Sequence, residues 1–295
     1  KFIDLINDIP NYDDALNISE IEEEIILEKI KNEEFTRIPT HNQLKNLKKL
    51  CSLKSAASFS VPGAGKTTEA LAYYAFHKNS KDSKLLVVCP INAFISWQEE
   101  IKKCFNSKHK INRLRGTPEQ LEDILMDEPE FMIINYDALR NTKKYDIIKD
   151  QLLDNQDNLT VIFDESHKLK GKTSLNSKLG IFAKDQKYKI LMASATSAIN
   201  PMDMRAMGYI LGLHNNTSFW SWVRRNGCYQ GRFGKTRIWR REDVPLFCCR
   251  YSRRHRGHSL GLFKVFHMER SGDPFGGFDR VRKNEGKWLG NSFAG

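Results

Sequence analysis

The chain reads Ser60-Val61-Pro62-Gly63-Ala64-Gly65-Lys66-Thr67-Thr68 directly after a short apolar run at residues 56–60. A phosphate group needs backbone N–H donors that no side chain obstructs, and the positive end of a following helix stabilises it further. Gly63 and Gly65 meet the first need, and the helical pattern that follows meets the second. We expect Lys66 to reach the β- and γ-phosphates and the Thr67 hydroxyl to bind Mg²⁺. Residues 60–68, named the phosphate loop below, are therefore expected to bind a nucleotide, although Ser60 stands where the general pattern has Gly.

Short apolar runs alternate with longer amphipathic stretches from about residue 40 onward. The expected strands are residues 56–60, 85–89, 131–134, 159–163 and 190–193, and the expected helices are residues 67–77, 94–104, 118–126, 145–153 and 175–183. Continuous runs of Val, Ile and Leu separated by helices are typical of a parallel sheet that is buried on both faces. The sequence therefore predicts an α/β fold in which ligands bind at the carboxyl ends of the strands.

A second chemical signature stands at the end of the strand expected at 159–163. Asp164 and Glu165 follow this apolar run and precede Ser166 and His167. Hydrolysis of a nucleoside triphosphate needs one carboxylate to hold the metal and another to orient or deprotonate the attacking water. We expect Asp164 to bind Mg²⁺ and Glu165 to act as the base, and Lys66 completes this catalytic set.

These residues resemble the superfamily 2 helicases, the DEAD/DEAH group. The phosphate loop resembles motif I, and Asp164-Glu165-Ser166-His167 resembles the DEAH box with Ser in place of Ala. Ser194-Ala195-Thr196 resembles motif III, which in this family couples the ATP site to nucleic acid, and His167 is assigned to the same coupling set. The resemblance implies a RecA-like lobe that uses ATP and Mg²⁺. The expected ATP contacts are Ser60, Pro62, Gly63, Ala64, Gly65, Lys66, Thr67, Thr68 and Gln43.

Longer matches resemble the Swi/Snf-type DNA translocases within that group. Residues 86–90, followed by Trp97, Glu100 and Ile101, resemble the motif Ia strand and its helix, and residues 133–139 resemble the TYE-L segment of the family. Residues 168–170 resemble its R-LKN continuation, and Asn200 falls at a family Asn, although Ser197 replaces the expected Pro. Gln43 is placed like the glutamine that reads adenine, and an ordinary polar helix residue is the alternative. The resemblance covers about residues 36–222 and implies duplex DNA as partner.

Lys and Arg outnumber Asp and Glu by 47 to 36, and the whole surplus lies near the end of the chain. Residues 223–295 hold 17 basic and 6 acidic side chains, with 13 Arg, 4 Lys and 11 Gly, whereas residues 1–222 hold 30 of each charge. Residues 1–38 are acidic, and their isoleucines at 21, 25, 26 and 30 are spaced for one apolar helix face. We expect an acidic helical extension at 1–38, a RecA-like lobe at 39–222 and an irregular basic tail at 223–295.

The tail leaves three interpretations open. Its arginines, with Trp239, Tyr251 and Phe266 among them, suit a nucleic-acid-binding extension. A metal site would use Cys248, Cys249, His255 and His258, whose spacing fits no usual zinc pattern. The third interpretation, which we favour, is an out-of-frame or disordered segment, because the composition changes abruptly from Lys-rich before residue 223 to Arg- and Gly-rich after it. The enzymes of the family that this chain resembles work with a second RecA-like lobe, whose arginines contact the γ-phosphate. The tail does not have the sequence pattern of such a lobe.

The function expected is that of an ATP hydrolase lobe of a translocase, which moves on DNA when it is joined to a second lobe. Two alternatives stay open: a catalytically incomplete nucleic-acid-binding module with a basic tail, and a helicase subunit of a restriction or phage-defence complex. Six cysteines without a CxxC pair argue against a disulfide scaffold, and the apolar runs are too short to cross a bilayer. We expect a soluble, intracellular protein of the cytoplasm, nucleoid or nucleus, without a membrane partner.

Overall fold

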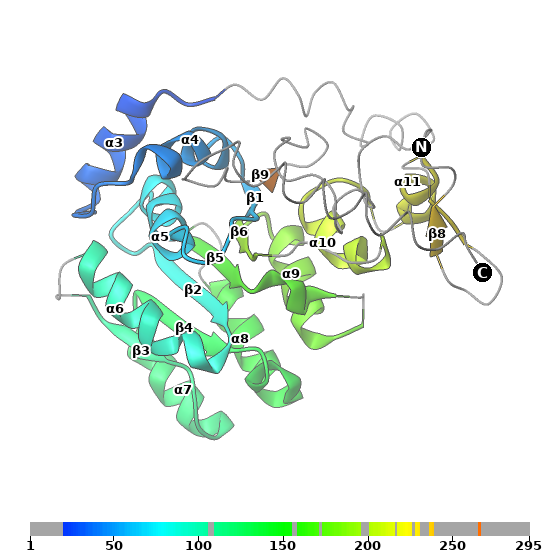
Figure 1. Ribbon diagram of the computed structural model, residues 1–295. Coiled ribbons are helices and arrows are strands. Elements are labelled where there is room, and N and C mark those ends of the chain that lie inside the picture. The colour runs from blue at the N-terminus through cyan, green and yellow to red at the C-terminus, as the bar shows by residue number, and fades with distance from the viewer. Residues whose placement is uncertain are drawn as a thin grey trace, which may run out of the picture.

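A parallel sheet with helices on both faces forms the centre of the molecule in the computed structural model (Figure 1). The structure describes residues 20–105, 109–154, 158–170, 173–195, 201–215, 217–225 and the short strands β7 (Cys228–Gln230), β8 (Thr236–Ile238) and β9 (Val265–Phe266). The longer strands are β1 (Ser55–Ser58), β2 (Lys84–Cys89), β3 (Ile111–Arg113), β4 (Phe131–Asn135), β5 (Leu159–Asp164) and β6 (Lys189–Ala193). The expected α/β fold with a parallel sheet is confirmed.

The strands lie in the order β3-β4-β2-β5-β6-β1-β9, and each neighbouring pair is parallel. Strands β7 and β8 form a separate antiparallel pair. All five expected strands are present, with ends that differ from expectation by one or two residues. Strand β3 was not expected from the sequence, because its three residues are half-buried and two of them are polar.

Side chains of the central strands alternate between two apolar clusters, one on each face of the sheet. In β2, Leu86 and Val88 belong to one cluster, and Leu85 and Val87 belong to the other. All four are fully buried. A period of two with apolar residues on both faces is what a sheet covered on both sides requires.

Each helix contributes buried residues to one of the two clusters and so covers one face of the sheet. One face is covered by α3 (Glu23–Asn32), α4 (His41–Leu50), α5 (Lys66–His77) and α6 (Phe94–Cys104), and the other by α7 (Pro118–Met126), α8 (Thr142–Asp154), α9 (Leu175–Asp185), α10 (Met204–Ile210) and α11 (Phe219–Arg225). The helices α6 and α7 have the expected bounds. Both α4 and α7 begin with a capping box, in which a Thr hydroxyl accepts from the backbone N–H of a Gln that bonds back. None of the helices in the described ranges is long and apolar enough to span a membrane.

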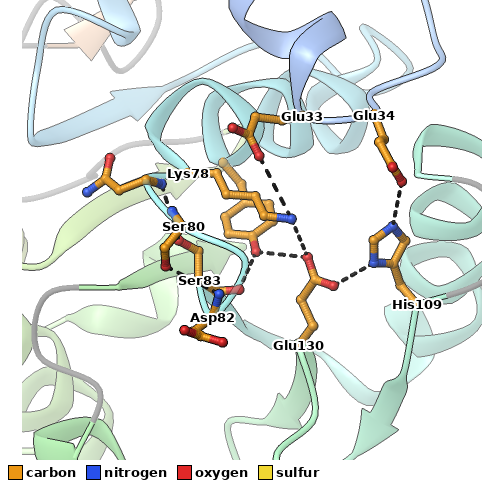
Figure 2. A network of polar contacts seen from close by, with 10 residues as sticks. Glu33, Glu34, Lys78, Ser80, Asp82, Ser83, His109 and Glu130 are labelled. Atoms are coloured by element: carbon orange, nitrogen blue, oxygen red, sulfur yellow. Dashed lines mark hydrogen bonds and ion pairs between the residues drawn. The ribbon is translucent and has the colours of Figure 1, made fainter.

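Helix α3 packs into the lobe through Ile26 and Ile30, which are both buried. Ile25, expected on the same apolar face, is instead 54% exposed, so that part of the expectation is wrong. A polar network also ties the end of α3 to the sheet (Figure 2): the Glu130 carboxylate before β4 contacts both Lys78 and His109. Lys78 and His109 each lie 4.0 Å from a glutamate at the end of α3, Glu33 and Glu34 respectively.

Candidate functional site

The order of the strands brings the two chemical signatures to one edge of the sheet. Strand β6 lies between β1, which leads into the phosphate loop, and β5, which ends at Asp164. Asp164 is in register with Ala193, and Ala193 is in register with Ser58. The phosphate loop, the end of β6 and the acidic pair therefore lie in a row at the carboxyl edge, where parallel sheets bind ligands.

The phosphate loop turns sharply at its two glycines. Gly63 and Gly65 have φ values of 80° and 76°, in the left-handed region that favours glycine. A Cβ added to Gly63 would meet open space, so the loop is accessible there, and Pro62 and Gly63 are exposed. Gly65 is the N-cap of α5, so the loop passes directly into the start of a helix.

The Lys66 ammonium group lies over its own loop. It donates to the carbonyl oxygens of Ser60 and Val61 at 3.1 and 3.2 Å. Ser60 is fully buried, and its hydroxyl lies 3.0 Å from that of Ser58. The Ser60 side chain therefore braces the base of the loop. Its carbonyl oxygen is the group that reaches Lys66.

The two threonines after Lys66 differ in environment. Thr67, the expected metal ligand, is half-buried. Thr68 is buried, and its hydroxyl donates to the Glu100 carboxylate of α6. Arg37 also pairs with Glu100. The Thr68 side chain is thus used to join α5 to α6. Its backbone N–H, in the first turn of α5, is the group left for a nucleotide contact.

Asp164 is held from three sides. Its Oδ2 accepts from the Trp97 indole N–H of α6 at 2.9 Å, and its Oδ1 accepts from the Glu165 backbone N–H at 2.9 Å. The Tyr136 hydroxyl donates to the Asp164 carbonyl oxygen at 2.6 Å. Burial raises the pKa of Asp164, while the bonds from Trp97 and Glu165 and the Lys66 charge oppose that rise. The Glu165 charge adds to the rise in pKa, and the Lys66 charge is the weakest of these influences.

Glu165, His167 and Ser194 form a small cluster beside Asp164. The Ser194 hydroxyl donates to Glu165 Oε2 at 3.3 Å, and His167 Nδ1 lies 3.0 Å from the same oxygen. His167 Nδ1 also lies 3.3 Å from the Ser194 hydroxyl. Glu165 has a φ of 50°, unusual for a residue other than glycine. These contacts join the DEAH-like box to Ser194, the first residue of the motif III-like segment. Ala195 is half-buried, and Thr196 lies outside the described residues.

Gln43 lies against the phosphate loop. Its Nε2 donates to the Gly65 carbonyl oxygen at 3.0 Å, and its Oε1 accepts from the Thr40 backbone N–H at 2.8 Å. Gln43 is buried, and a Cβ on Gly65 would come within 2.5 Å of its Nε2. The backbone angle favours glycine at 65, and a Cβ there would also displace the Gln43 amide. The capping box gives Gln43 a structural role in addition to any contact with a base.

These residues fit Mg²⁺ and a nucleotide in their chemistry. Carboxylate and hydroxyl oxygens are the protein ligands that Mg²⁺ takes, usually one or two of them together with phosphate oxygens and water. Asp164 and Thr67 supply this donor set, and the glycines, the start of α5 and Lys66 supply the donors for phosphate. When bound, the metal ion would neutralise charge on the phosphates.

A cavity of about 330 Å³ opens at the same edge of the sheet, next to strands β2, β3 and β4. Arg113, Arg115 and Lys144 line it together with apolar side chains that include Ile91 and Ile95. Arg113 is held in place by Gln98 and by the Phe94 ring, whose centroid lies 5.8 Å from the guanidinium carbon. Arg115 is exposed and Lys144 half-buried, and neither forms an ion pair with any carboxylate in the described part of the chain.

Residues 24–199 match the family of the type III restriction enzyme, res subunit. The chain belongs to this family. The match spans more than half of the chain and contains the phosphate loop, the acidic pair and the end of β6. Residues 24–199 are a helicase-type, RecA-like lobe, as the sequence resemblance implied, and the family is one of helicase-type ATP hydrolases.

Three curated relatives are similar to this chain, and two of them carry Swi/Snf names. The chain is 25% identical over 138 residues to a SWI/SNF-related matrix-associated actin-dependent regulator of chromatin subfamily A-like protein 1 homolog of Caenorhabditis elegans, covering 47% of this chain and 19% of that protein. It is 29% identical over 149 residues to the SWI/SNF chromatin-remodeling complex subunit snf22 of Schizosaccharomyces pombe (49% and 8%) and 30% identical over 115 residues to the nuclear protein STH1/NPS1 of Saccharomyces cerevisiae (38% and 8%). The matches span less than a fifth of these relatives.

Among solved structures, the Sulfolobus solfataricus SWI2/SNF2 ATPase core in complex with dsDNA is similar, with a TM-score of 0.49 and 16% identity over 65% of this chain and 39% of that one.

Sequence reasoning missed the groups that hold the site and the cationic cavity. Trp97 was noted only as part of a longer resemblance, and its bond to Asp164 comes from the packing of α6 on the sheet. The sequence did not indicate that Arg115 and Lys144 line a cavity, and Arg115 follows β3, a strand that the sequence pattern does not predict.

Proposed function

We propose that this lobe binds Mg-ATP between the phosphate loop and Asp164 and is one half of a motor that moves along duplex DNA. The observation that carries the proposal is the register that sets Ser58, Ala193 and Asp164 side by side, with the phosphate loop following directly after β1. A phosphate cradle and a metal-binding carboxylate at one sheet edge are the two parts that nucleotide hydrolysis needs.

Each site residue has a proposed task. The backbone from Ser60 to Thr68 and the Lys66 ammonium bind phosphates, Thr67 and Asp164 bind the metal ion, and Glu165 orients or deprotonates water. His167, Ser194, Ala195 and Thr196 form the coupling set between the nucleotide and the nucleic acid. Gln43 contacts the adenine from α4 while it holds Gly65.

DNA is proposed to contact the cavity at the ends of β2, β3 and β4. Arg115 and Lys144 are free to neutralise phosphates, and Arg113 is already fixed in position. Phosphate contacts give affinity without reading sequence, which suits a protein that must step along any duplex. The names of the relatives refer to chromatin or to the nucleus, so the nucleoid or nucleus is the proposed place of action. A second RecA-like lobe is the proposed partner for hydrolysis.

Binding of a fluorescent Mg-ATP analogue to the purified chain tests the proposal. Lys66→Ala is expected to abolish binding, because the ammonium group of Lys66 holds the phosphates. Lys81→Ala is the matched control, since Lys81 is an exposed lysine on the loop before β2. Equal affinity of the Lys66→Ala variant and the wild type would overturn the assignment.

The matching family also favours a second candidate function, a motor subunit of a restriction system. A restriction motor cuts the DNA along which it moves, whereas a remodelling translocase leaves the strands intact. Plasmid DNA incubated with the complete protein and ATP separates the two, because ATP-dependent double-strand breaks are expected only for a restriction motor.

The basic tail gives a third possibility, a nucleic-acid-binding module without motor activity. Its residues lie outside the described ranges apart from residues 223–225 at the end of α11 and the short strands β7, β8 and β9. Affinity that depends on the tail would weaken steeply with salt and vanish on truncation after residue 222. For the proposed motor lobe, duplex binding persists after that truncation.

A further inference from the structure

Helix α4 contacts the phosphate-loop helix at a second polar point, one turn beyond Gln43. Asn46 Nδ2 donates to Glu69 Oε2 at 2.7 Å. Asn46 is 5% exposed and Glu69 is 1% exposed, so this bond is shielded from water. Glu69 lies in the first turn of α5, three residues after Lys66.

The two contacts are matched in spacing. Gln43 and Asn46 lie one turn apart on α4, and their acceptors, the Gly65 carbonyl oxygen and the Glu69 carboxylate, lie about one turn apart at the start of α5. A single bond lets one helix pivot against the other. Two bonds one turn apart fix both the rotation and the sliding of α4 relative to α5.

The apolar contacts of α4 do not supply this precision. Leu47 and Leu50 are buried in the same cluster as the inner face of α5, and they hold the two helices together. Apolar burial is non-directional, whereas a hydrogen bond is sensitive to distance and angle. The position of Gln43 relative to Gly65 therefore depends on the polar pair.

Glu69 is also an expensive residue to bury. Burial raises the pKa of its carboxyl to about 6, while the Ser58 hydroxyl, the Asn46 bond and the Lys66 charge act against that rise. Its Oε1 has no hydrogen-bond partner within the described ranges. A buried carboxylate with one oxygen unpaired costs stability that an apolar side chain of similar size would not. The hydrogen bond from Asn46 offsets part of this cost in stability.

We propose that Asn46 and Glu69 are positioning residues of the nucleotide site, which hold Gln43 against Gly65 and so fix the phosphate loop in its binding shape. Neither residue is proposed to contact the nucleotide. The inference rests on the proposed binding of Mg-ATP by the phosphate loop.

A reciprocal exchange of the two side chains tests the bond itself. Asn46→Asp sets two carboxylates against each other, and we expect the affinity for a fluorescent Mg-ATP analogue to fall about tenfold. The double variant Asn46→Asp with Glu69→Gln restores the bond with donor and acceptor exchanged, and its affinity should return to within about twofold of the wild type. Affinity that stays at the wild-type level in Asn46→Asp, or that is not restored in the double variant, overturns the proposal.

A second variant separates positioning from packing and does not bury a lone charge. Asn46→Leu with Glu69→Met removes both polar groups and keeps similar volumes, so the thermal midpoint should stay near or above that of the wild type. We expect Mg-ATP affinity to fall in this variant all the same. An unchanged affinity in a folded Asn46→Leu, Glu69→Met protein contradicts the proposal, whatever the folding of Asn46→Asp. Failure of the wild type to bind Mg-ATP would instead contradict the proposed function.

Discussion

The indole nitrogen of Trp97 lies 2.9 Å from Oδ2 of Asp164. Trp97 is 1% exposed and belongs to α6, whereas Asp164 ends β5. This bond fixes the orientation of the half-buried Asp164 carboxylate. Glu100, on the same helix as Trp97, accepts a hydrogen bond from the Thr68 hydroxyl of α5. Helix α6 is therefore tied both to the proposed metal ligand and to the phosphate-loop helix.

Trp97→Phe tests the importance of this bond. A hydrogen bond to a charged group contributes about 1.5 to 3 kcal/mol, so its loss is expected to weaken Mg-ATP binding about tenfold while nucleotide binding without metal changes little. Titration calorimetry with and without Mg²⁺ measures the difference. Trp220→Phe on α11 is the control. Equal losses with and without metal would show that Trp97 acts only on packing.

Glu165→Gln separates binding from hydrolysis. The amide keeps an oxygen that can accept from Ser194, so Mg-ATP affinity should stay within about twofold of the wild type. Loss of the base should lower turnover by at least about 100-fold in the protein with its second lobe. A coupled assay of phosphate release measures this, with the exposed Glu122→Gln as control. Turnover equal to that of the wild type removes Glu165 as the base.

Arg115→Ala and Lys144→Ala are expected to weaken duplex binding without changing Mg-ATP affinity. Each lost phosphate contact lowers the slope of log affinity against log salt by about 1. Fluorescence anisotropy with a short duplex at several salt concentrations measures the slope. Lys143→Ala is the matched control, because Lys143 is exposed, adjacent in sequence and outside the cavity. An unchanged slope in both variants places the DNA elsewhere.

His77 gives a prediction about acid stability. Burial, and then the charges of Lys189 and Lys29, lower the pKa of His77 to about 3, so the folded state keeps this imidazole neutral while the unfolded state takes up a proton below about 6.5. Stability from His77 is therefore full above pH 6.5 and is lost as the pH falls toward 3, at up to about 1.4 kcal/mol per pH unit. Urea unfolding from pH 7 to 5 should show a shallower loss for His77→Phe than for the wild type. Parallel curves for the two proteins would contradict this role.

Periodicity predicts most of the sheet, because strands buried on both faces are continuous apolar runs. It fails for β3, whose residues Ile111-Asn112-Arg113 are only half-buried at one edge of the sheet. It also fails for Ile25, since helical spacing alone does not show how wide the buried face of α3 is. These features depend on neighbours that are distant in sequence.

The candidate site was predictable where its chemistry is local. Lys66 and Asp164 are recognisable from the residues beside them, but their meeting depends on β6 lying between β1 and β5, which spacing along the chain does not reveal. The engagement of Thr68 by Glu100 and of Asp164 by Trp97 arises from how α6 packs on the sheet. The roles of Lys66, Asp164 and Glu165 stay predictions.

We propose that Lys66 and Asp164, far apart in sequence, form one Mg-nucleotide site. Titration calorimetry of ATP into the wild type, Lys66→Ala and Asp164→Asn, each with and without Mg²⁺, tests it most directly. We predict that Mg²⁺ strengthens ATP binding to the wild type, that Lys66→Ala binds under neither condition, and that Asp164→Asn binds ATP but gains nothing from Mg²⁺. Wild-type affinity that is the same with and without Mg²⁺, and unchanged in both variants, would contradict the claim.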